Sequence, residues 1–534
     1  MLKFLLKEQE IKKQIHAYLL AFLSLSLLGL SSAQAIPVTI STLSDPASGT
    51  EAASNCSGDE TAGYTCNTLR DFFAKAQEQH AADPTLKIYE ISFTSGGVLT
   101  LSGDAFFIDT EDTYTINGGG SLSINGNASS AIFTGYFSLI DLTLNNLVLE
   151  NSTGIIVALG AHITANNCSF LNSTTTDNGA AILIGTGSLN ITNSNFSGNS
   201  STKSGGAIYA SNASEINIQG STFSDNTATN NGGAIYIDAP ITTTIVNSSF
   251  YNNEATGTGG ALYLTDSSAG EGGGGAVYDI ANSTFYGNTA SSAGGIINGA
   301  STLNLTHVTL EQNTANGAGQ AQNLFNFSTG TSIRNSIIGT PGTGDGPSCT
   351  TVNIATSTHN LYYTSDAEVA NASSCLNFSA ETDLSTTDIL GNFNESLGVV
   401  ELLEGSQAIG NAEFLEDFAS DQLGNSRSAG ATDIGAYQKP ASSGGIDPNQ
   451  DPGYCGDGML DPGEECDDGA LNGQADSPNQ CATNCTPLSP LFQFGNENAS
   501  SGCSLSLKAT TNHLGTWLVF LSILGLGLVR RAKN

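Results

Sequence analysis

The chain has 534 residues and a formal net charge of −34, because 49 acidic residues outnumber 15 basic ones. Seven of the basic residues lie in the terminal segments 1–16 and 530–534, which leaves eight for the long segment between them. Since phosphate recognition needs clustered lysine and arginine, this segment is a poor partner for nucleic acid and for anionic lipid surfaces.

The first 35 residues have the pattern of a secretory signal peptide. Four lysines lie within residues 1–16, an apolar run covers 17–30, and Ala33 and Ala35 form an A-x-A cleavage site before Ile36. We therefore leave the segment 1–35 out of the fold. Export also permits disulfide bonds among the ten cysteines of the chain.

An N-terminal cap is predicted over residues 36–87. Cys56 and Cys66 are close neighbours in this segment and are expected to pair. The stretch 66–76, followed by the strand-like stretch 88–93, resembles the CSLREA motif that opens many exported β-helix proteins. It predicts a short amphipathic helix that covers the exposed edge of the first coil.

A repeated pattern dominates residues 165–325. Phenylalanines recur at steps of 26, 27, 27 and 35 residues, an asparagine lies three residues after most of them, and glycine pairs keep the same step. The members are Phe170, Phe196, Phe223, Phe250 and Phe285; Asn199, Asn226, Asn253 and Asn288; and Gly205-Gly206, Gly232-Gly233, Gly259-Gly260 and Gly294-Gly295. A period of this length means stacked repeats.

The strands within each repeat are short, and Gly, Asn and Ser turns separate them. One coil of about three such strands cannot bury its own apolar face, so it must stack on the next coil. The sequence therefore predicts an all-β fold, a right-handed parallel β-helix over residues 88–400. The step of 35 residues is attributed to an insertion around 270–275, which we expect to form a loop off one coil.

The recurring residues have physical roles in such a stack. Inward phenylalanines form an aromatic column, and asparagines of successive coils form an amide ladder and tolerate left-handed backbone. The glycine pairs allow turns that are closed to residues with a Cβ atom. Cys168 takes the position at which later repeats have serine, on the same face as Phe170, and is expected to be a buried, inert thiol.

The pairing of F-x-x-N with G-G-A-[ILV] resembles the repeats of polymorphic outer membrane proteins, which are β-helical surface proteins linked to adhesion. Three repeats carry both parts of the pattern. The residues concerned are Phe196, Asn199, Gly205, Gly206, Phe223, Asn226, Gly232, Gly233, Phe250, Asn253, Gly259 and Gly260. The resemblance implies a cell-surface or outer-membrane protein.

A C-terminal cap is predicted over residues 401–440. The stretches 405–409, 421–427 and 433–437 resemble the choice-of-anchor Q domain, which ends β-helical surface proteins and precedes anchoring tails. Within it, Arg427 and Asp433 are expected to form a structural ion pair at the closing coil. Upstream, Cys349 and Cys375 lie 26 residues apart, about one repeat, so adjacent coils would bring them together.

After a linker at 441–452, residues 453–487 form a small cysteine-rich module that resembles a short extracellular repeat. Cys455, Cys466, Cys481 and Cys485 allow three pairings, and disulfides replace the core that so few residues cannot build. The module also supplies candidate Ca²⁺ ligands, which are Asp457, Asp461, Glu464, Asp467 and Asp468. The same carboxylates also suit turns, and no other metal or cofactor is expected.

The chain ends with a spacer at 488–513 and a transmembrane or sorting tail at 514–534. An apolar run of 16 residues covers 514–529 and Arg530-Arg531 follows it. As a helix, the run would extend about 24 Å, and the basic pair should stay cytoplasmic. With Cys503 in the preceding Gly-Cys motif, the tail resembles MYXO-CTERM sorting signals, which makes Cys503 the candidate anchoring residue; a plain anchor helix is the alternative.

Taken together, the sequence predicts a β-helical protein of the bacterial cell envelope, anchored in a membrane by its C-terminus. We expect an adhesin or another binding or structural role, with an extracellular carbohydrate or protein as partner and no catalytic residue. The alternative is a polysaccharide lyase or glycoside hydrolase on the same fold. Asp225 and Asp238 are the nearest approach to a catalytic carboxylate pair, but solvated turn residues are the preferred explanation for them.

Overall fold

A computed structural model describes residues 34–440, apart from 47–50, 109, 136–139, 239–241, 268–274, 300–301, 329, 344, 352–353, 364–381 and 387–389. Residues 441–534 therefore lie outside the described residues. They comprise the predicted linker, the cysteine-rich module with its candidate Ca²⁺ ligands, the spacer and the tail with Cys503. All of the predicted signal peptide except residues 34 and 35 lies outside them as well. Among the helices that can be examined, none is both long and apolar enough to span a bilayer.

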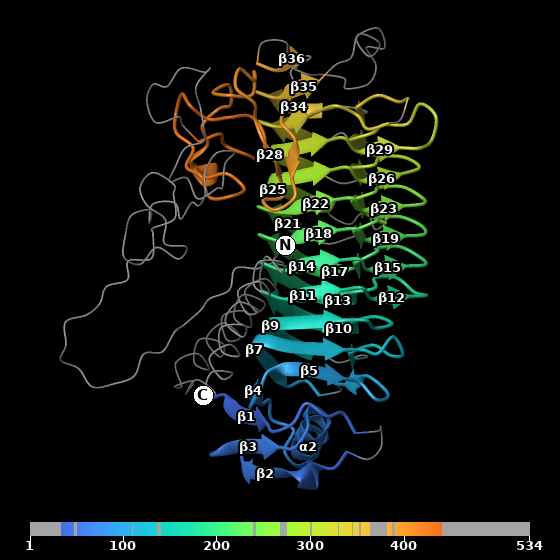
Figure 1. The fold of residues 1–534 in the computed structure, drawn as a ribbon, viewed down its shortest axis with the longest axis vertical. Helices are drawn as coiled ribbons and strands as arrows, with labels where there is room; N and C mark the ends of the chain where they lie inside the picture. Colours follow the sequence, from blue (N-terminus) through green and yellow to red (C-terminus); the bar gives the residue numbers. More distant parts are fainter. Residues whose placement is uncertain are drawn as a thin grey trace, which may run out of the picture. The chain divides into compact units, whose positions relative to one another are not determined.

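The described chain winds into a right-handed β-solenoid, in which the strands of successive coils lie above one another (Figure 1). The first coils contain β1 (Ile36–Ile40), β4 (Ile88–Phe93), β5 (Gly97–Thr100), β6 (Phe106–Phe107), β7 (Thr113–Asn125), β8 (Phe133–Gly135) and β9 (Ile140–Glu150). The middle coils contain β10 (Ile156–Asn166), β11 (Ser169–Leu171), β13 (Ile182–Thr192), β14 (Asn195–Ser197), β16 (Ile208–Ser211), β17 (Ala213–Gln219), β18 (Thr222–Ser224), β20 (Ile235–Asp238), β21 (Thr242–Val246) and β22 (Ser249–Tyr251).

The later coils continue the same order of strands. They contain β24 (Leu262–Thr265), β25 (Val277–Tyr286), β27 (Ile296–Asn298), β28 (Thr302–Glu311), β30 (Leu324–Asn326), β31 (Thr331–Arg334), β32 (Ile337–Ile338), β33 (Cys349–Thr351), β34 (Ile354–Thr358), β35 (Leu361–Tyr363) and β36 (Leu384–Thr386). Pairing between coils is parallel and mostly in register, so equivalent residues of successive repeats lie opposite one another. The predicted stack of coils is confirmed.

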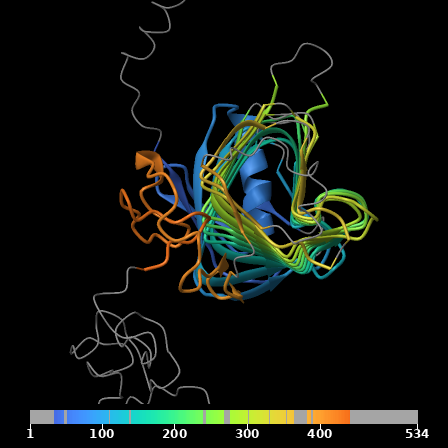
Figure 2. The ribbon, with the colours of Figure 1, turned by 90° about the horizontal axis from the view of Figure 1, so that it is seen from above.

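A helix covers the N-terminal end of the core. Helix α2 (Leu69–Ala82) begins at Thr68, whose side chain accepts a hydrogen bond from the backbone N–H of Asp71. Its buried face includes Phe72 and Phe73, and the ring of Phe72 meets that of Tyr89 edge-on at 5.2 Å. Seen along the solenoid axis, the helix lies within the outline of the coils (Figure 2), where it shields the first coil from water.

Beside α2, the chain forms a short antiparallel hairpin after a single 3-10 turn, η1 (Ala53–Asn55). Its strands are β2 (Cys56–Asp59) and β3 (Gly63–Cys66), with Cys56 directly opposite Cys66. These two cysteines form a disulfide, as their spacing suggests. Cys349 is also disulfide-bonded, and Cys375, its expected partner, lies outside the described residues.

The phenylalanines form the predicted column inside the solenoid. Neighbouring rings from Phe170 to Phe285 lie 4.5 to 4.8 Å apart and within 6° of parallel. The 35-residue step does not disturb the column, because Phe250 and Phe285 remain opposite each other in register. The extra residues of that repeat fall between β24 and β25, so they leave the core unchanged.

A second column consists of buried asparagine amides. From Asn199 to Asn313, each Nδ2 group donates to the Oδ1 atom of the next asparagine at 2.7 to 3.0 Å and to a phenylalanine carbonyl oxygen of the preceding coil. Asn199, Asn226, Asn253 and Asn288 belong to this ladder, and Asn313 and Asn323 extend it. Each amide satisfies buried backbone groups that the solenoid turn leaves unpaired.

The left-handed backbone predicted for these asparagines belongs to the residue before each of them. Gly198, Asp225, Asn252 and Gly287 have φ between 55° and 67°. The ladder residue itself points inward after the chain has turned, so its amide and the left-handed turn occupy adjacent positions. Glycine, asparagine and aspartate all tolerate such a φ, which explains why the preceding position varies among these residue types.

Cys168 belongs to a second row of buried hydrogen bonds, which runs alongside the asparagine ladder. Serines 194, 221, 248 and 283 each accept a hydrogen bond at Oγ from the backbone N–H of the equivalent residue one coil earlier, and Cys168 begins this row by donating its N–H to Ser194. The thiol is 1% exposed, and burial raises its pKa to about 11. A thiol in this state is a weak nucleophile, in agreement with the prediction of a buried, inert cysteine.

The segment 390–440, here called the flank segment, differs from the predicted C-terminal cap. It contains β37 (Phe393–Asn394), β38 (Val399–Val400) and η2 (Glu416–Phe418), and it lies against the side of the coils rather than across their end (Figure 2). Gln422 donates to Ser249 Oγ at 2.7 Å and accepts from Thr284 Oγ1 at 2.7 Å. Hydroxyl and amide groups on the outer face of β22 and β25 therefore hold it.

Arg427 and Asp433 do not form the predicted ion pair. The Arg427 guanidinium donates to Asn282 Oδ1 at 2.6 Å and to the carbonyl oxygen of Gly435 at 2.8 Å. The Asp433 carboxylate accepts from the backbone N–H groups of Gly410 and Lys439. Both side chains instead bond to backbone N–H and carbonyl groups of the flank segment. These backbone groups need side-chain partners because most of the flank segment has no regular secondary structure.

The buried side chain of His307 makes the stability of the fold depend on pH. Burial, with a smaller contribution from nearby Arg427, lowers its pKa to about 2, far below the 6.5 of a free imidazole. The unfolded chain therefore binds a proton as pH falls below about 6.5 while the folded chain does not, so stability is full above that pH and declines below it. His307 alone therefore lowers the free energy of unfolding by about 2 kcal/mol between pH 7 and pH 5. Burial raises the pKa of Glu311 to about 7, which stabilises the fold as pH falls through the same interval, so the His307 contribution shows as a difference from a variant that cannot titrate.

Denaturant unfolding at the two pH values measures this effect, with His307→Gln as the comparison. Glutamine retains an acceptor for the Asn335 amide, which lies 3.0 Å from His307 Nε2, but cannot titrate. The variant should lose about 2 kcal/mol less than the wild type between the two pH values. Equal losses in both proteins would contradict the assignment.

Candidate binding groove

A lobe projects from one corner of the solenoid. It is built from β12 (Thr174–Thr175), β15 (Ser200–Ser201), β19 (Thr227–Ala228), β23 (Glu254–Ala255), β26 (Thr289–Ala290) and β29 (Thr314–Ala315), which form a separate six-stranded sheet. In each of these coils the chain passes through the lobe and then returns to the wall strand of the next coil (Figure 2). A groove of about 420 Å³ lies where the lobe meets that wall.

The glycine pairs shape the return from the lobe. Gly205, Gly232 and Gly259 have φ of 68° to 69°, a conformation that side-chain-bearing residues rarely adopt. The second glycine of each pair is required for a different reason: a Cβ atom on Gly206 would overlap the carbonyl oxygen of Gly233 in the next coil. The pair therefore combines a left-handed turn with close packing of backbone on backbone.

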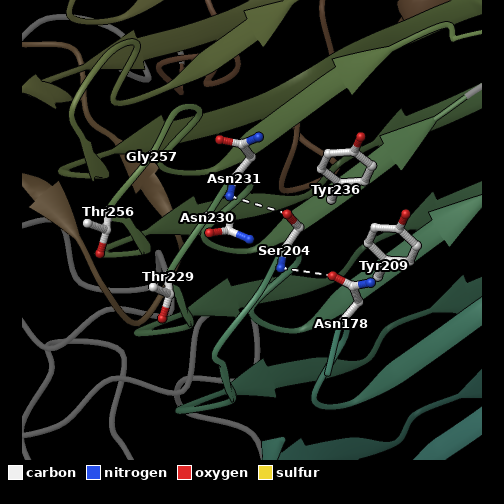
Figure 3. Close-up of a pocket in the computed structure, with 9 residues that line it drawn as sticks. All are labelled: Asn178, Ser204, Tyr209, Thr229, Asn230, Asn231, Tyr236, Thr256 and Gly257. Atoms are coloured by element: carbon white, nitrogen blue, oxygen red, sulfur yellow. Dashed lines mark hydrogen bonds between the residues drawn. The ribbon is translucent and has the colours of Figure 1, made fainter. Parts of the chain in front are cut away.

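Nine residues line the groove, and none of them is charged (Figure 3). They are Asn178, Ser204, Tyr209, Thr229, Asn230, Asn231, Tyr236, Thr256 and Gly257. Ionised side chains begin outside this set, with the exposed ion pair of Lys203 and Asp177 at 2.7 Å. The hydrogen bond from Lys203 lowers the pKa of Asp177, so the pair stays ionised and its charges balance.

Tyr209 and Tyr236 form one wall of the groove, and they belong to a row of stacked tyrosines that continues beyond it. Tyr209 on β16, Tyr236 on β20 and Tyr263 on β24 occupy equivalent outward positions, with ring centroids 4.9 and 5.0 Å apart. Burial, followed by the charge of Asp238, raises the pKa of each phenol. The hydroxyls therefore remain protonated and act as both hydrogen-bond donors and acceptors.

The opposite side of the groove carries amides and hydroxyls. Asn178 Oδ1 accepts from the Ser204 backbone N–H at 3.0 Å, and Asn231 Oδ1 accepts from the Thr258 backbone N–H at 3.1 Å. These bonds fix both amides, and Figure 3 shows their nitrogen atoms directed toward the tyrosine side. As far as the described residues go, the side chain of Asn230 makes no hydrogen bond within the protein.

Backbone groups around the groove already have partners. The N–H of Asn230 donates to the Lys203 carbonyl at 2.7 Å, and the N–H of Gly257 donates to the Asn230 carbonyl at 2.7 Å. The N–H groups of Thr229 and Thr256 likewise bond to the preceding coil. A ligand in this groove must therefore be recognised by side chains, because the sheet edge needed for strand addition is not available there.

The alternative catalytic pair is not assembled. Asp225 is a left-handed turn residue between β18 and β19, with φ of 55°. Asp238 ends β20 on the wall of the next coil, where its carboxylate accepts from the N–H of Ser267 at 2.8 Å and from the Ser267 hydroxyl at 2.9 Å. Within the described residues, no group of three or more His, Cys, Asp and Glu side chains could hold a metal ion.

The tyrosine row was not among the predicted functional residues. A signal for it is present in the sequence, because Tyr209, Tyr236 and Tyr263 each lie four positions after the first glycine of a pair. The alternation of strand residues places these tyrosines outside the core. What the sequence does not give is the position of the lobe, which turns an outward-facing row into the wall of a groove.

Comparison with known proteins supports the interpretation of the repeats. Residues 193–211, 220–238 and 247–265 match the Chlamydia polymorphic membrane protein (Chlamydia_PMP) repeat. Each matched segment runs from the turn before a core phenylalanine to the wall strand that carries a tyrosine of the stacked row. These matches cover three coils, well under half of the chain, and no curated protein is significantly similar to it.

Among solved structures, the crystal structure of pectate lyase Pel9A is similar over 77% of this chain and 98% of that chain. The sequence identity is 12% and the TM-score is 0.37. A superposition this loose transfers no residue roles, so the assignment of the fold rests on the strand register of the chain itself.

Proposed function

We propose that this chain is an exported binding protein of the bacterial cell surface or outer membrane, acting as an adhesin. The observation that carries the proposal is the groove, whose lining is uncharged, aromatic and rich in amides and hydroxyls. Such a lining suits reversible recognition by hydrogen bonds and apolar contact. The matches to the Chlamydia polymorphic membrane protein repeat support a surface location and cover the tyrosines of this groove.

Catalysis is less well supported by the same residues. Cleavage of an acidic polysaccharide needs a general base and a cation or metal close to the substrate carboxylate. The groove offers none of these groups among its lining residues, and Asp225 and Asp238 serve a turn and a loop contact. Anchoring through Cys503 or through an intact apolar helix at 514–534 is part of the proposal and is supported by the sequence pattern.

Adhesion of cells that export the full-length chain tests this function. We expect them to bind immobilised extracellular carbohydrate or matrix several-fold more than cells that lack the chain, and to release no oligosaccharide from acidic polysaccharides. Asp225→Ala and Asp238→Ala should leave adhesion unchanged. Polysaccharide cleavage that either substitution abolishes would refute the adhesin and establish the enzyme.

A further inference from the structure

The tyrosine row continues beyond the groove along the solenoid wall. In-register pairing places Val157 opposite Leu183, Leu183 opposite Tyr209, and Tyr263 opposite Ile297. The row therefore follows the solenoid axis over at least six successive coils, with aromatic members in the middle and aliphatic members on both sides. Ile297 is only 6% exposed, so the members that a ligand can reach are those from Val157 to Tyr263.

The stacking of the tyrosines determines which of their groups a ligand can reach. The rings of Tyr209 and Tyr236 lie within 11° of parallel, and those of Tyr236 and Tyr263 lie within 5°. Their faces cover one another, so each ring offers its edge and its hydroxyl. In Figure 3, the hydroxyls of Tyr209 and Tyr236 point the same way. A ligand therefore meets a line of phenol hydroxyls that recur at the coil spacing.

The lining of the groove, which has amides and hydroxyls but no charged side chain, limits the kind of ligand that can bind there. No charged residue lines it, and the whole chain carries a net charge of −34, which disfavours sulfated, phosphorylated or carboxylated polymers. Saturated backbone bonds exclude strand addition by a peptide. Amides and phenol hydroxyls match a ligand that has many hydroxyls, since each can donate or accept a hydrogen bond.

We propose that the groove binds a linear, neutral polysaccharide that lies parallel to the solenoid axis, with successive sugar units on successive coils. The inference deepens the proposed adhesin function and depends on it for its biological context. Asn178 and Asn231, held by their Oδ1 bonds, donate from Nδ2 to sugar hydroxyls on one side, and Tyr236 donates or accepts on the other. Asn230 adds an amide that needs no rearrangement before it binds.

Isothermal titration of the purified full-length protein tests this site. The probes are mono-, di-, tetra- and hexasaccharides of β-1,4-linked glucose and of N-acetylglucosamine, with a heparin hexasaccharide as the anionic counterpart. We expect affinity for one neutral series to increase with chain length, because each added sugar meets another coil, and we expect the heparin fragment not to bind.

Two substitutions remove ligand contacts while keeping the packing. Tyr236→Phe deletes a hydroxyl but keeps the ring stack, and Asn230→Ala deletes an amide without a partner inside the protein. Together they should lower affinity for the hexasaccharide by about tenfold or more. The matched controls are Tyr286→Phe, whose ring stacks on Phe393 of the flank segment, and Asn217→Ala on the outer face of β17; both should bind as the wild type does.

The inference is wrong if no neutral oligosaccharide binds, if affinity does not depend on length, or if the groove variants bind as tightly as their controls. Binding of an extended peptide that the groove variants weaken would replace the glycan by a protein ligand. Adhesion by displaying cells that persists without glycan binding would overturn this inference alone. Glycan binding without adhesion would overturn the proposed adhesin while leaving the site intact.

Discussion

Replacing Asn226 by alanine is expected to lower the free energy of unfolding by about 4 kcal/mol. Asn226 is fully buried; its Nδ2 group donates to the Phe196 carbonyl and to Asn253 Oδ1, both at 2.9 Å. Its Oδ1 accepts from the side chain of Asn199 at 3.0 Å and from the backbone N–H of Asn199 at 3.1 Å. Alanine leaves these partners without water or protein groups to bond.

The comparison for this prediction is Asn217→Ala, on the outer surface of the same coil. Asn217 also donates to an asparagine of the neighbouring coil, Asn190, at 3.0 Å, but it is only half-buried, so water can replace it. Its loss should cost less than about 1 kcal/mol. Urea unfolding followed by circular dichroism measures both values. Equal costs would mean that the buried ladder adds nothing beyond an ordinary surface hydrogen bond.

Gly233→Ala should destabilise the solenoid by more than about 4 kcal/mol, or prevent folding. A Cβ atom there would overlap the Gly260 carbonyl oxygen and lie 2.6 and 2.7 Å from the backbone C and N atoms of Glu254. These are backbone atoms of the next coil, so they can move only if the two coils separate. No left-handed φ is involved, so the expected effect is steric.

The matched control is Gly275→Ala, at the start of the segment that leads into β25. An added Cβ at Gly275 would meet no atom within 4 Å, so this substitution should change stability by less than about 0.5 kcal/mol. Thermal unfolding of both variants, together with the yield of folded protein, checks the prediction. A Gly233→Ala protein that is as stable as the wild type would show that neighbouring coils can separate slightly at little cost.

The core of the solenoid was predictable because a fixed period and strand alternation together determine it. Phe223 and Asn226 recur in equivalent positions, and parallel pairing places equivalent residues opposite each other, so the two columns follow from the sequence. The position of the left-handed residue did not follow. Asp225 and Asn226 are adjacent and both belong to residue types that accept such a turn, so residue type alone cannot tell which of them adopts it.

The groove and the flank segment depend on contacts that no local pattern encodes. Gln422 meets Ser249 across 173 residues of chain. Its sequence neighbourhood indicates only that a further module follows the solenoid, without saying which surface that module covers. The tyrosine row likewise becomes a groove only after the lobe strands have stacked. Sequence reasoning therefore found the core residues that repeat with the coil, and missed those whose role depends on how separate segments meet.

The in-register columns also bear on how such a protein changes length over time. Each coil touches only its two neighbours, and Phe223 and Phe250, 27 residues apart, have nearly identical surroundings. Unequal recombination between two such segments of the gene adds or deletes one whole unit without creating a new kind of contact. The extent of the outer surface, and with it the number of sites offered in tandem, can thus evolve without a redesign of the interior.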